Sequence, residues 1–218
     1  MRAHLRSILL SGLIAVLALG ASAFPAQAAM PVEFIRETAN EVLVILKDPA
    51  LDSDAKIARI EKIAYARFDF ETMSRLVLAR NWRRLKPDQQ REFVEQFKKH
   101  LSVTYGRNVD AYANESVDVT GDRKEPRGDW TVQTKILRGG PSQDILVDYR
   151  LRQKDGDWKV IDVVVERISL VSNFRSQIQE IISRDGVDGM LALLRSKNAS
   201  GESILPEEDR KPGEKAAD

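Results

Sequence analysis

The amino-acid sequence predicts an α+β domain, in which a curved antiparallel sheet is wrapped by helices as a cone and carries an added helical part. Apolar residues first recur at three- and four-residue spacing between Pro31 and Tyr105, as in amphipathic helices. Between Trp130 and Val165 the period changes to two, which is typical of strands. After Ser169 the helical period returns. This order of helices, strands and helices is the basis of the fold-class prediction.

Four helices are expected before the strands. Pro31–Lys47 and residues 52–64 carry apolar stripes at helical spacing. Asp69 can cap a third helix, and Pro87 suits the first turn of a fourth because an amide hydrogen is not needed there. The inward-facing side chains expected from the third and fourth helices are Met73, Leu76, Phe93, Phe97, Leu101 and Tyr105.

Three strands are expected next, at Trp130–Ile136, Ile145–Leu151 and Trp158–Val165. Turn residues separate them, Gly139-Gly140-Pro141 after the first strand and Asp155-Gly156 after the second. Both faces of the last strand are rich in apolar residues, so this strand is expected to be covered on both sides.

The chain is expected to close with helices and a tail. Apolar residues follow a helical pattern to Ile182, the pattern breaks at Asp185-Gly186, and residues 187–194 resume it. Residues 199–218 are polar and acidic, and we expect them to form a disordered tail. The folded domain is therefore predicted to span residues 29–198.

Residues 1–28 have the pattern of a secretory signal peptide. Arg2 and Arg6 form a positive start, Ile8–Leu19 an apolar run, and Ala26-Gln27-Ala28 a cleavage site. The run is shorter than the roughly 20 apolar residues that a membrane-spanning helix needs. We therefore expect a soluble, exported mature protein.

Composition argues against several functional classes. Without Arg2 and Arg6 the chain has 32 basic residues (34 − 2) against 33 acidic ones, which does not favour nucleic-acid binding. The absence of cysteine excludes both a disulfide framework and a lipid-modified cysteine. His100 would be the one histidine of the mature chain, so neither a zinc site nor a Ser-His-Asp triad is expected. Its neighbours Lys99 and Leu101 suggest that His100 lies at the surface.

A short basic cluster precedes the fourth helix, with Arg80, Arg83, Arg84 and Lys86 close to Asp88. The preferred interpretation is a solvated helix end. A docking patch for an acidic partner or a lipid headgroup is the functional alternative.

Asp162 is the one acid within the last strand, where alternation places it on the same face as Val164. Burial raises the pKa of a carboxyl group, and with Tyr149 or Tyr105 opposite it, Asp162 could act as a base in an isomerase. In the preferred structural interpretation, Asp162 pairs with Arg175 or accepts hydrogen bonds from local backbone amides.

The amount of apolar surface indicates an enclosed cavity. Each buried methylene contributes about 0.8 kcal/mol, so an acyl chain of about sixteen carbons would gain about 12 kcal/mol on entering it. A surface groove would instead leave a large apolar patch in water. The residues expected to line the cavity are Met73, Leu76, Phe93, Phe97, Leu101, Tyr105, Val132, Ile136, Ile145, Val147, Tyr149, Val160 and Val164.

Two blocks of the sequence resemble the MlaC family, also called the toluene-tolerance family. The first is FDFETMSRLVLARNW, from Phe68 to Trp82, and the second runs from Trp158 to Ile182. Together the matches span most of residues 35–195. The positions that match best are Phe68, Phe70, Met73, Trp82, Phe93, Phe97, Tyr105, Tyr149, Trp158, Asp162, Ser169, Asn173 and Arg175.

The resemblance implies a non-enzymatic periplasmic lipid carrier with the cone of the nuclear-transport-factor-like superfamily. Its cargo would be a diacyl phospholipid, with the acyl chains in the cavity and the headgroup near solvent. The implied partners are the MCE-domain component of an inner-membrane ABC transporter and an outer-membrane lipoprotein complex. No metal or organic cofactor is implied.

The sequence departs from the family pattern at three points. Arg167 stands where the family usually has glycine, Phe174 stands where it often has tyrosine, and Ala79-Arg80-Asn81 lacks a glycine that commonly precedes Trp82. These changes leave a hopanoid or sterol-like cargo open. A small-molecule isomerase on the same fold and an adaptor that binds only proteins are the alternatives from other classes.

Overall fold

The computed structural model describes residues 30–106, 115–138 and 143–206. Its elements are, in order, α1 (Pro31–Lys47), α2 (Ser53–Arg67), α3 (Phe70–Leu78), the 3-10 helix η1 (Ala79–Arg84), α4 (Pro87–Tyr105), β1 (Ser116–Lys124), the 3-10 helix η3 (Pro126–Gly128), β2 (Trp130–Leu137), β3 (Ile145–Lys154), β4 (Asp157–Val165), β5 (Ile168–Ser169) and α5 (Leu170–Ser200). The predicted α+β class is confirmed. The predicted signal peptide, residues 1–28, lies outside the described residues.

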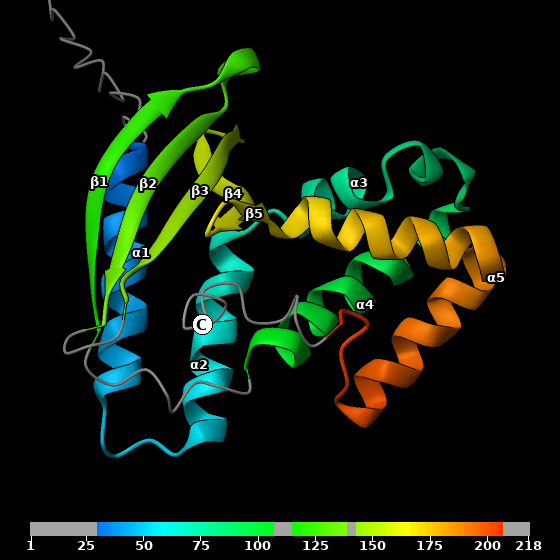
Figure 1. The fold of residues 1–218 in the computed structure, drawn as a ribbon, viewed down its shortest axis with the longest axis horizontal. Helices are drawn as coiled ribbons and strands as arrows, with labels where there is room; N and C mark the ends of the chain where they lie inside the picture. The colour runs from blue at the N-terminus through cyan, green and yellow to red at the C-terminus, as the bar shows by residue number, and fades with distance from the viewer. Residues whose placement is uncertain (1–29, 107–114, 139–142, 207–218) are drawn as a thin grey trace, which may run out of the picture.

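The strands form one antiparallel sheet in the order β1-β2-β3-β4-β5. Figure 1 shows α1 lying along one face of this curved sheet, with α2 beside it, while α3, α4 and α5 form a separate helical layer. The strand β1 was not predicted, because the sequence pattern was interpreted as strand only from Trp130 onward.

The starts of three helices follow from their capping residues. Asp52, Asp69 and Ser169 precede α2, α3 and α5, and each side chain accepts a hydrogen bond from the backbone amide three residues later. The predicted break in the last helix is confirmed, since Gly186 has φ 72° and ψ −176° inside α5. Glycine adopts this conformation without a steric penalty.

Two separate apolar cores stabilise the fold, and Phe68 packs against both. The helical core, from α3, α4, α5 and the residues around them, contains Met73, Val77, Leu78, Leu85, Phe93, Phe97, Val171, Phe174, Ile178, Ile181, Ile182, Met190, Leu191, Leu194 and Leu205. The sheet core, between α1 and the inner face of the sheet, contains Phe34, Ile35, Val132, Ile145, Val147, Leu151, Trp158, Val160 and Val163.

The predicted face of Val164 is wrong. Arg150 pairs with Asp162 while Leu151 pairs with Val160, so Ile161 is an extra residue in β4, a β-bulge. Alternation restarts after the bulge, and Val163 rather than Val164 joins Val160 in the sheet core. The true inner face of β4 is therefore continuous across the bulge, and Val164 and Asp162 lie on the outer face.

The predicted start of a disordered tail at residue 199 is too early. α5 continues to Ser200, and residues 201–206 return to α4 as an ordered segment, with Leu205 only 1% exposed in the helical core. Residues 207–218 lie outside the described residues.

His100 holds this returning segment and is completely buried, which corrects its predicted surface position. Its Nε2 accepts the backbone amide of Ile204 at 3.0 Å, and its Nδ1 lies 2.7 Å from Oδ1 of Asn198. The sequence could not reveal this role, because both partners lie about a hundred residues further along the chain.

Two turns use positive φ without glycine, and both coincide with departures from the family pattern. Ala79 has φ 49° and ψ −121°, and Arg167 has φ 69° beside Glu166 at 47°. These conformations suit glycine better than residues with a Cβ atom. The surrounding structure therefore holds some strain at both turns.

Candidate functional site

The thirteen predicted site residues do not surround one space, because the structure divides them between the two cores. Those in or against the helical core are Met73, Leu76, Phe93, Phe97, Leu101 and Tyr105. Those in or against the sheet core are Val132, Ile136, Ile145, Val147, Tyr149 and Val160. Val164 belongs to neither core.

Among the described helices, α1 and α2, which form a hairpin, bury their apolar side chains least completely. No residue of α2 is buried, and α1 buries only Pro31, Phe34 and Ile35 at its start. Seven further apolar residues of the hairpin are partly exposed and belong to neither core. We call this set the hairpin lining: Val42, Leu43, Ile45, Leu46, Ile57, Ile60 and Ile63.

The hairpin lining follows the same helical spacing as a buried core face, so its partial exposure is informative. α1 contacts β1, β2 and α2, while α2 contacts α1 and β4. Helices of a filled core would bury such a stripe completely. The sequence pattern had marked these helices as amphipathic, but it gave no sign that their apolar faces would be left partly uncovered.

Two contacts of polar or charged groups join α2 to α4. The hydroxyl of Ser102 donates to Glu61, and the ammonium of Lys98 lies 3.8 Å from the ring centre of Tyr65. At the end of α4, Gly106 lies so close to Ile57 that an added Cβ would be 3.7 Å from that side chain. The hairpin is therefore attached to the helical layer along one edge.

A cleft of about 520 Å³ lies between α1, α2 and the β3–β4 hairpin, within the usual size range of ligand sites. Phe34 and Trp158 of the sheet core line it, together with Ile63 of the hairpin lining. Its charged lining residues are Glu37, Glu41, Lys62, Arg67, Asp157 and Lys159. The cleft thus connects solvent with the edge of the sheet core.

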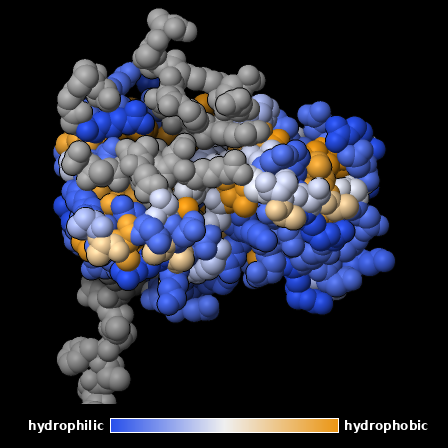
Figure 2. Space-filling view, turned by 90° about the horizontal axis from the view of Figure 1, so that it is seen from below, coloured by the Kyte–Doolittle hydropathy of each residue, from blue (hydrophilic) through white to orange (hydrophobic). Residues whose placement is uncertain are grey.

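Arg67 holds two of the other residues that line the cleft, Glu41 and Phe34. Its Nη2 donates to Glu41 at 2.6 Å, and its guanidinium lies 5.1 Å from the ring centre of Phe34. Figure 2 shows the molecule from below, where apolar residues reach the surface between hydrophilic ones. The part of the molecule around the hairpin therefore combines accessible apolar side chains with charges of both signs.

Tyr149 lies on the inner face of the sheet, paired with Val132 of β2 and Val163 of β4. Its side chain packs against the sheet core, and desolvation by burial raises its pKa to about 12. The residue is nevertheless partly accessible. Tyr149 is therefore an inner-face residue that the sheet core does not cover completely.

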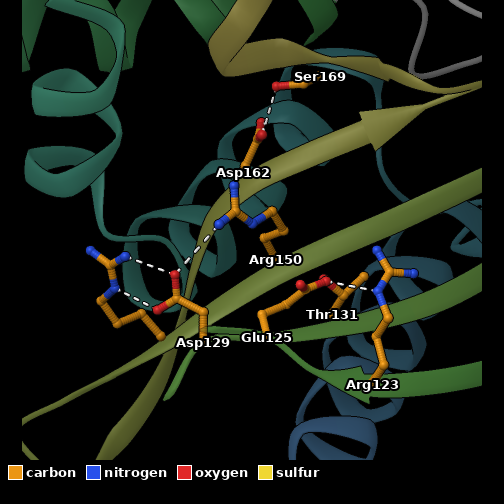
Figure 3. Close-up of polar contacts among 8 residues, drawn as sticks. Arg123, Glu125, Asp129, Thr131, Arg150, Asp162 and Ser169 are labelled. Atoms are coloured by element: carbon orange, nitrogen blue, oxygen red, sulfur yellow. Dashed lines mark hydrogen bonds and ion pairs between the residues drawn. The ribbon is translucent and has the colours of Figure 1, made fainter. Parts of the chain in front are cut away.

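Asp162 has a structural role at the junction between β4 and α5. It is 4% exposed, and its carboxylate accepts hydrogen bonds from the Ser169 hydroxyl at 2.6 Å and the Val171 amide at 3.1 Å (Figure 3). Burial raises its pKa, although these hydrogen bonds oppose the shift. The predicted bonding to a local backbone amide is confirmed, whereas the predicted pairing with Arg175 is wrong, because Arg175 donates to the carbonyl of Leu76.

This geometry does not support the isomerase alternative. Asp162 lies on the outer face of the sheet, whereas Tyr149 lies on the inner face, and Tyr105 packs against the helical core. The base and the tyrosine donor that such chemistry requires are thus not brought together. Among the described residues there is also no group of three metal-ligating side chains.

Ion pairs cover the outer face of the sheet (Figure 3). Asp129 is buried and accepts two hydrogen bonds from Arg152, both at 2.7 Å, and a longer one from Arg150 at 3.5 Å. The hydroxyl of Thr131 donates to Glu125 at 2.8 Å. The two faces of the sheet therefore differ, with charges on the outer face and apolar side chains on the inner one.

The part of the chain that the structure describes contains no helix that is both long and apolar enough to cross a membrane. A search among proteins of known structure finds a phospholipid-binding protein from Ralstonia solanacearum, solved in complex with a phospholipid, with a TM-score of 0.71. It is 24% identical, and the alignment covers 78% of this chain and 97% of that one. This similarity supports the fold.

Sequence relatives agree with this match. The chain is 28% identical over 190 residues to the toluene tolerance protein ttg2D of Pseudomonas putida, covering 84% of this chain and 86% of that protein. It is 18% identical over 142 residues to the intermembrane phospholipid transport system binding protein MlaC of Haemophilus influenzae, covering 64% and 65%. The MlaC protein family itself matches residues 36–196, which include the hairpin, the sheet and most of the helical layer. With this match over most of its length, the chain belongs to the MlaC family.

Proposed function

We propose that this protein is a lipid carrier that binds the acyl chains of a diacyl phospholipid between the α1–α2 hairpin and the inner face of the sheet. The observation that carries the proposal is the hairpin lining, a set of apolar side chains that neither core covers. The Ralstonia relative, which has the same fold, was solved with a phospholipid. Membership of the MlaC family supports the same cargo class.

The energetics favour an apolar ligand at this place. Every methylene that moves from water into contact with the lining gains about 0.8 kcal/mol, and the lining side chains lose contact with water at the same time. A carrier must offer a gain of this size for each chain, because the bilayer offers the same gain. Partly covered residues such as Ile60 and Leu46 can supply it without unfolding either core.

The headgroup would remain near solvent, at the cleft. Its lining carries cations such as Lys62 and acids such as Glu37 beside the apolar side chains. A phosphate and an amine can both find opposite charges there. A hopanoid or sterol-like lipid would use the same apolar lining but would not need these charges.

The transport route is the finer part of the proposal. The carrier would act in the periplasm and would move lipid between the MCE-domain component of an inner-membrane ABC transporter and an outer-membrane lipoprotein complex. Family membership and the predicted signal peptide at residues 1–28 support this route.

Native mass spectrometry of the mature protein, purified from the periplasm and followed by lipid extraction, tests the cargo. We expect a bound mass that matches a diacyl phospholipid. An apoprotein that takes up no lipid from vesicles would refute the proposal and would favour the protein-only adaptor. A bound hopanoid would keep the carrier but change its cargo.

A further inference from the structure

An exposed basic loop lies at the outer end of the helical layer. We call residues 79–86, which are η1 and the two residues after it, the basic loop. Its four cations, Arg80, Arg83, Arg84 and Lys86, are all exposed, and the loop contains no acid. The nearest acid along the chain is Asp88, the second residue of α4.

Among the described residues, none of the four cations is in an ion pair. Arg84 donates only to the neutral amide of Asn81 at 3.0 Å. Asp188, which comes close to this end from α5, accepts a hydrogen bond from Gln89. The basic loop therefore presents positive charge that its surroundings do not neutralise.

The backbone beneath these charges is held firmly. Asn81 and Leu85 are buried, and the side-chain amide of Gln90 donates to the carbonyls of Trp82 at 2.9 Å and Leu85 at 3.3 Å. The loop enters through the strained turn at Ala79. Such anchoring fixes the backbone positions that carry the cations, so a binding partner does not have to order the loop backbone.

We propose that the basic loop is a docking surface for a membrane that contains anionic lipids. Each cation near an anionic bilayer strengthens binding about fivefold, so four of them together give several hundredfold. Trp82 is half-buried beside them, with the guanidinium of Arg75 5.2 Å from its ring, and tryptophan suits the bilayer interface.

The make-up of the loop favours a membrane over an acidic protein. Protein interfaces are usually centred on a buried anchor that fills a pocket of the partner. Here Leu85 is turned into the helical core, and four of the five exposed positions of the loop are cationic. A continuous layer of phosphate groups fits such a surface without a matching pocket.

The basic loop lies far from the hairpin, so docking through the loop would leave the hairpin uncovered. Figure 1 shows η1 at the end of the helical layer that lies away from the α1–α2 hairpin. Docking through this end would hold the carrier at the membrane while the hairpin stays free to exchange lipid. The surface is thus separate from the proposed lipid site, and this inference goes beyond the proposed function.

Flotation of the mature protein with vesicles tests the proposal. Vesicles of phosphatidylcholine alone are compared with vesicles that also contain phosphatidylglycerol, at low and at high salt. We expect binding only to the anionic vesicles, weakened by salt. The double variant Arg80→Glu/Arg83→Glu should bind at least about 25-fold more weakly, from about fivefold for each cation.

The matched control is Lys99→Glu/Lys124→Glu, which changes the net charge equally at two exposed positions outside the loop. It should keep vesicle binding, whereas equal weakening in both double variants would overturn the proposal. Wild-type protein that ignores phosphatidylglycerol would also overturn it, and loop-dependent binding of polyglutamate instead would assign the surface to an acidic protein. Lipid content after extraction, unchanged in both variants, keeps this test independent of the lipid-carrier proposal.

Discussion

The helical core and the hairpin lining are built from the same kind of amphipathic helix, but only the helical core is closed. Phe93 and Phe97 of α4 are fully buried, and their rings stack with centres 5.7 Å apart. Ile57 and Ile60 of α2 follow the same spacing and remain partly exposed. The difference is that one apolar surface is closed within the fold, whereas the other is the surface to which the proposed function assigns the acyl chains.

The sheet lies between the hairpin and the helical layer, and its two faces have different surroundings. Its inner face packs against the start of α1, and the cleft opens at its edge through Phe34 and Trp158. Its outer face is joined to α5 through Asp162. The sheet therefore contacts the hairpin on its inner face and the helical layer on its outer face.

Phe97→Ala should have the largest effect on stability. Removing a ring that is buried in the helical core is expected to lower the free energy of unfolding by about 3–5 kcal/mol. Ile60→Ala, in the hairpin lining, should cost less than about 2 kcal/mol in lipid-free protein, because its side chain is already partly hydrated. Urea unfolding of both variants measures the contrast. Equal losses would remove the distinction between the two regions.

Ile60→Glu should separate lipid binding from folding. A carboxylate in the lining would have to lose its water to contact an acyl chain, so lipid occupancy should fall at least about tenfold. Ala58→Glu on the same helix is the matched control, because position 58 is exposed. Lipid extraction gives the occupancy, and circular dichroism checks the fold. Full occupancy in the Ile60 variant would show that the chains lie elsewhere.

Asp162 tests the junction between the sheet and the helical layer. Asp162→Ala removes an acceptor at the start of α5 and should cost about 1–2 kcal/mol, as for other lost helix caps. Asp162→Asn keeps an acceptor for the Val171 amide and should cost less. Urea midpoints at constant pH distinguish the two, and equal costs would contradict the hydrogen-bonding role.

A comparison of the wild-type protein with Asp162→Asn at different pH values tests the raised pKa of Asp162. Because its folded-state pKa lies above the unfolded value of about 3.9, its contribution to stability is fully present below that value. The contribution is lost as the pH rises through the folded-state pKa. The stability of wild type relative to Asp162→Asn should therefore fall over this range. A relative rise would contradict the raised pKa.

The smallest expected change is a gain at the strained turn beside the helical core. Ala79→Gly should raise the free energy of unfolding by about 1 kcal/mol, because glycine relieves the strain at positive φ. Ala192→Gly, at an exposed position inside α5, should instead lower it by about 0.8–1 kcal/mol. Thermal unfolding compares the two. A loss in both variants would mean that Ala79 is not strained.

Periodicity and turn residues were enough to predict the sequence of helices, then strands, then a final helix with a break at Gly186, although not β1, since these are local properties of the chain. They could not reveal the bulge at Ile161. A bulge has no signature in the composition of this apolar strand, yet it moves every later residue to the opposite face. The buried role of His100 and the ordered position of Leu205 likewise depend on contacts between distant parts of the chain.

The candidate site depends on which apolar faces are covered. The sequence predicts large apolar residues such as Phe93 and Phe97 as cavity lining, and the structure places them in the helical core. Sequence patterns identify an apolar helix face without telling whether another surface covers it. The hairpin residues carried the same signal as the core residues, and only their partial exposure in the folded chain distinguishes them.

Photo-cross-linking tests the central claim most directly, with a phospholipid that carries a diazirine near the end of an acyl chain. The protein is loaded with this lipid and irradiated, and the labelled peptides are mapped by mass spectrometry. The account predicts labels on α1, α2 and the inner face of the sheet, at residues such as Leu46, Ile60 and Tyr149. Labels confined to α3, α4 and α5, around Phe93 and Phe97, would contradict it.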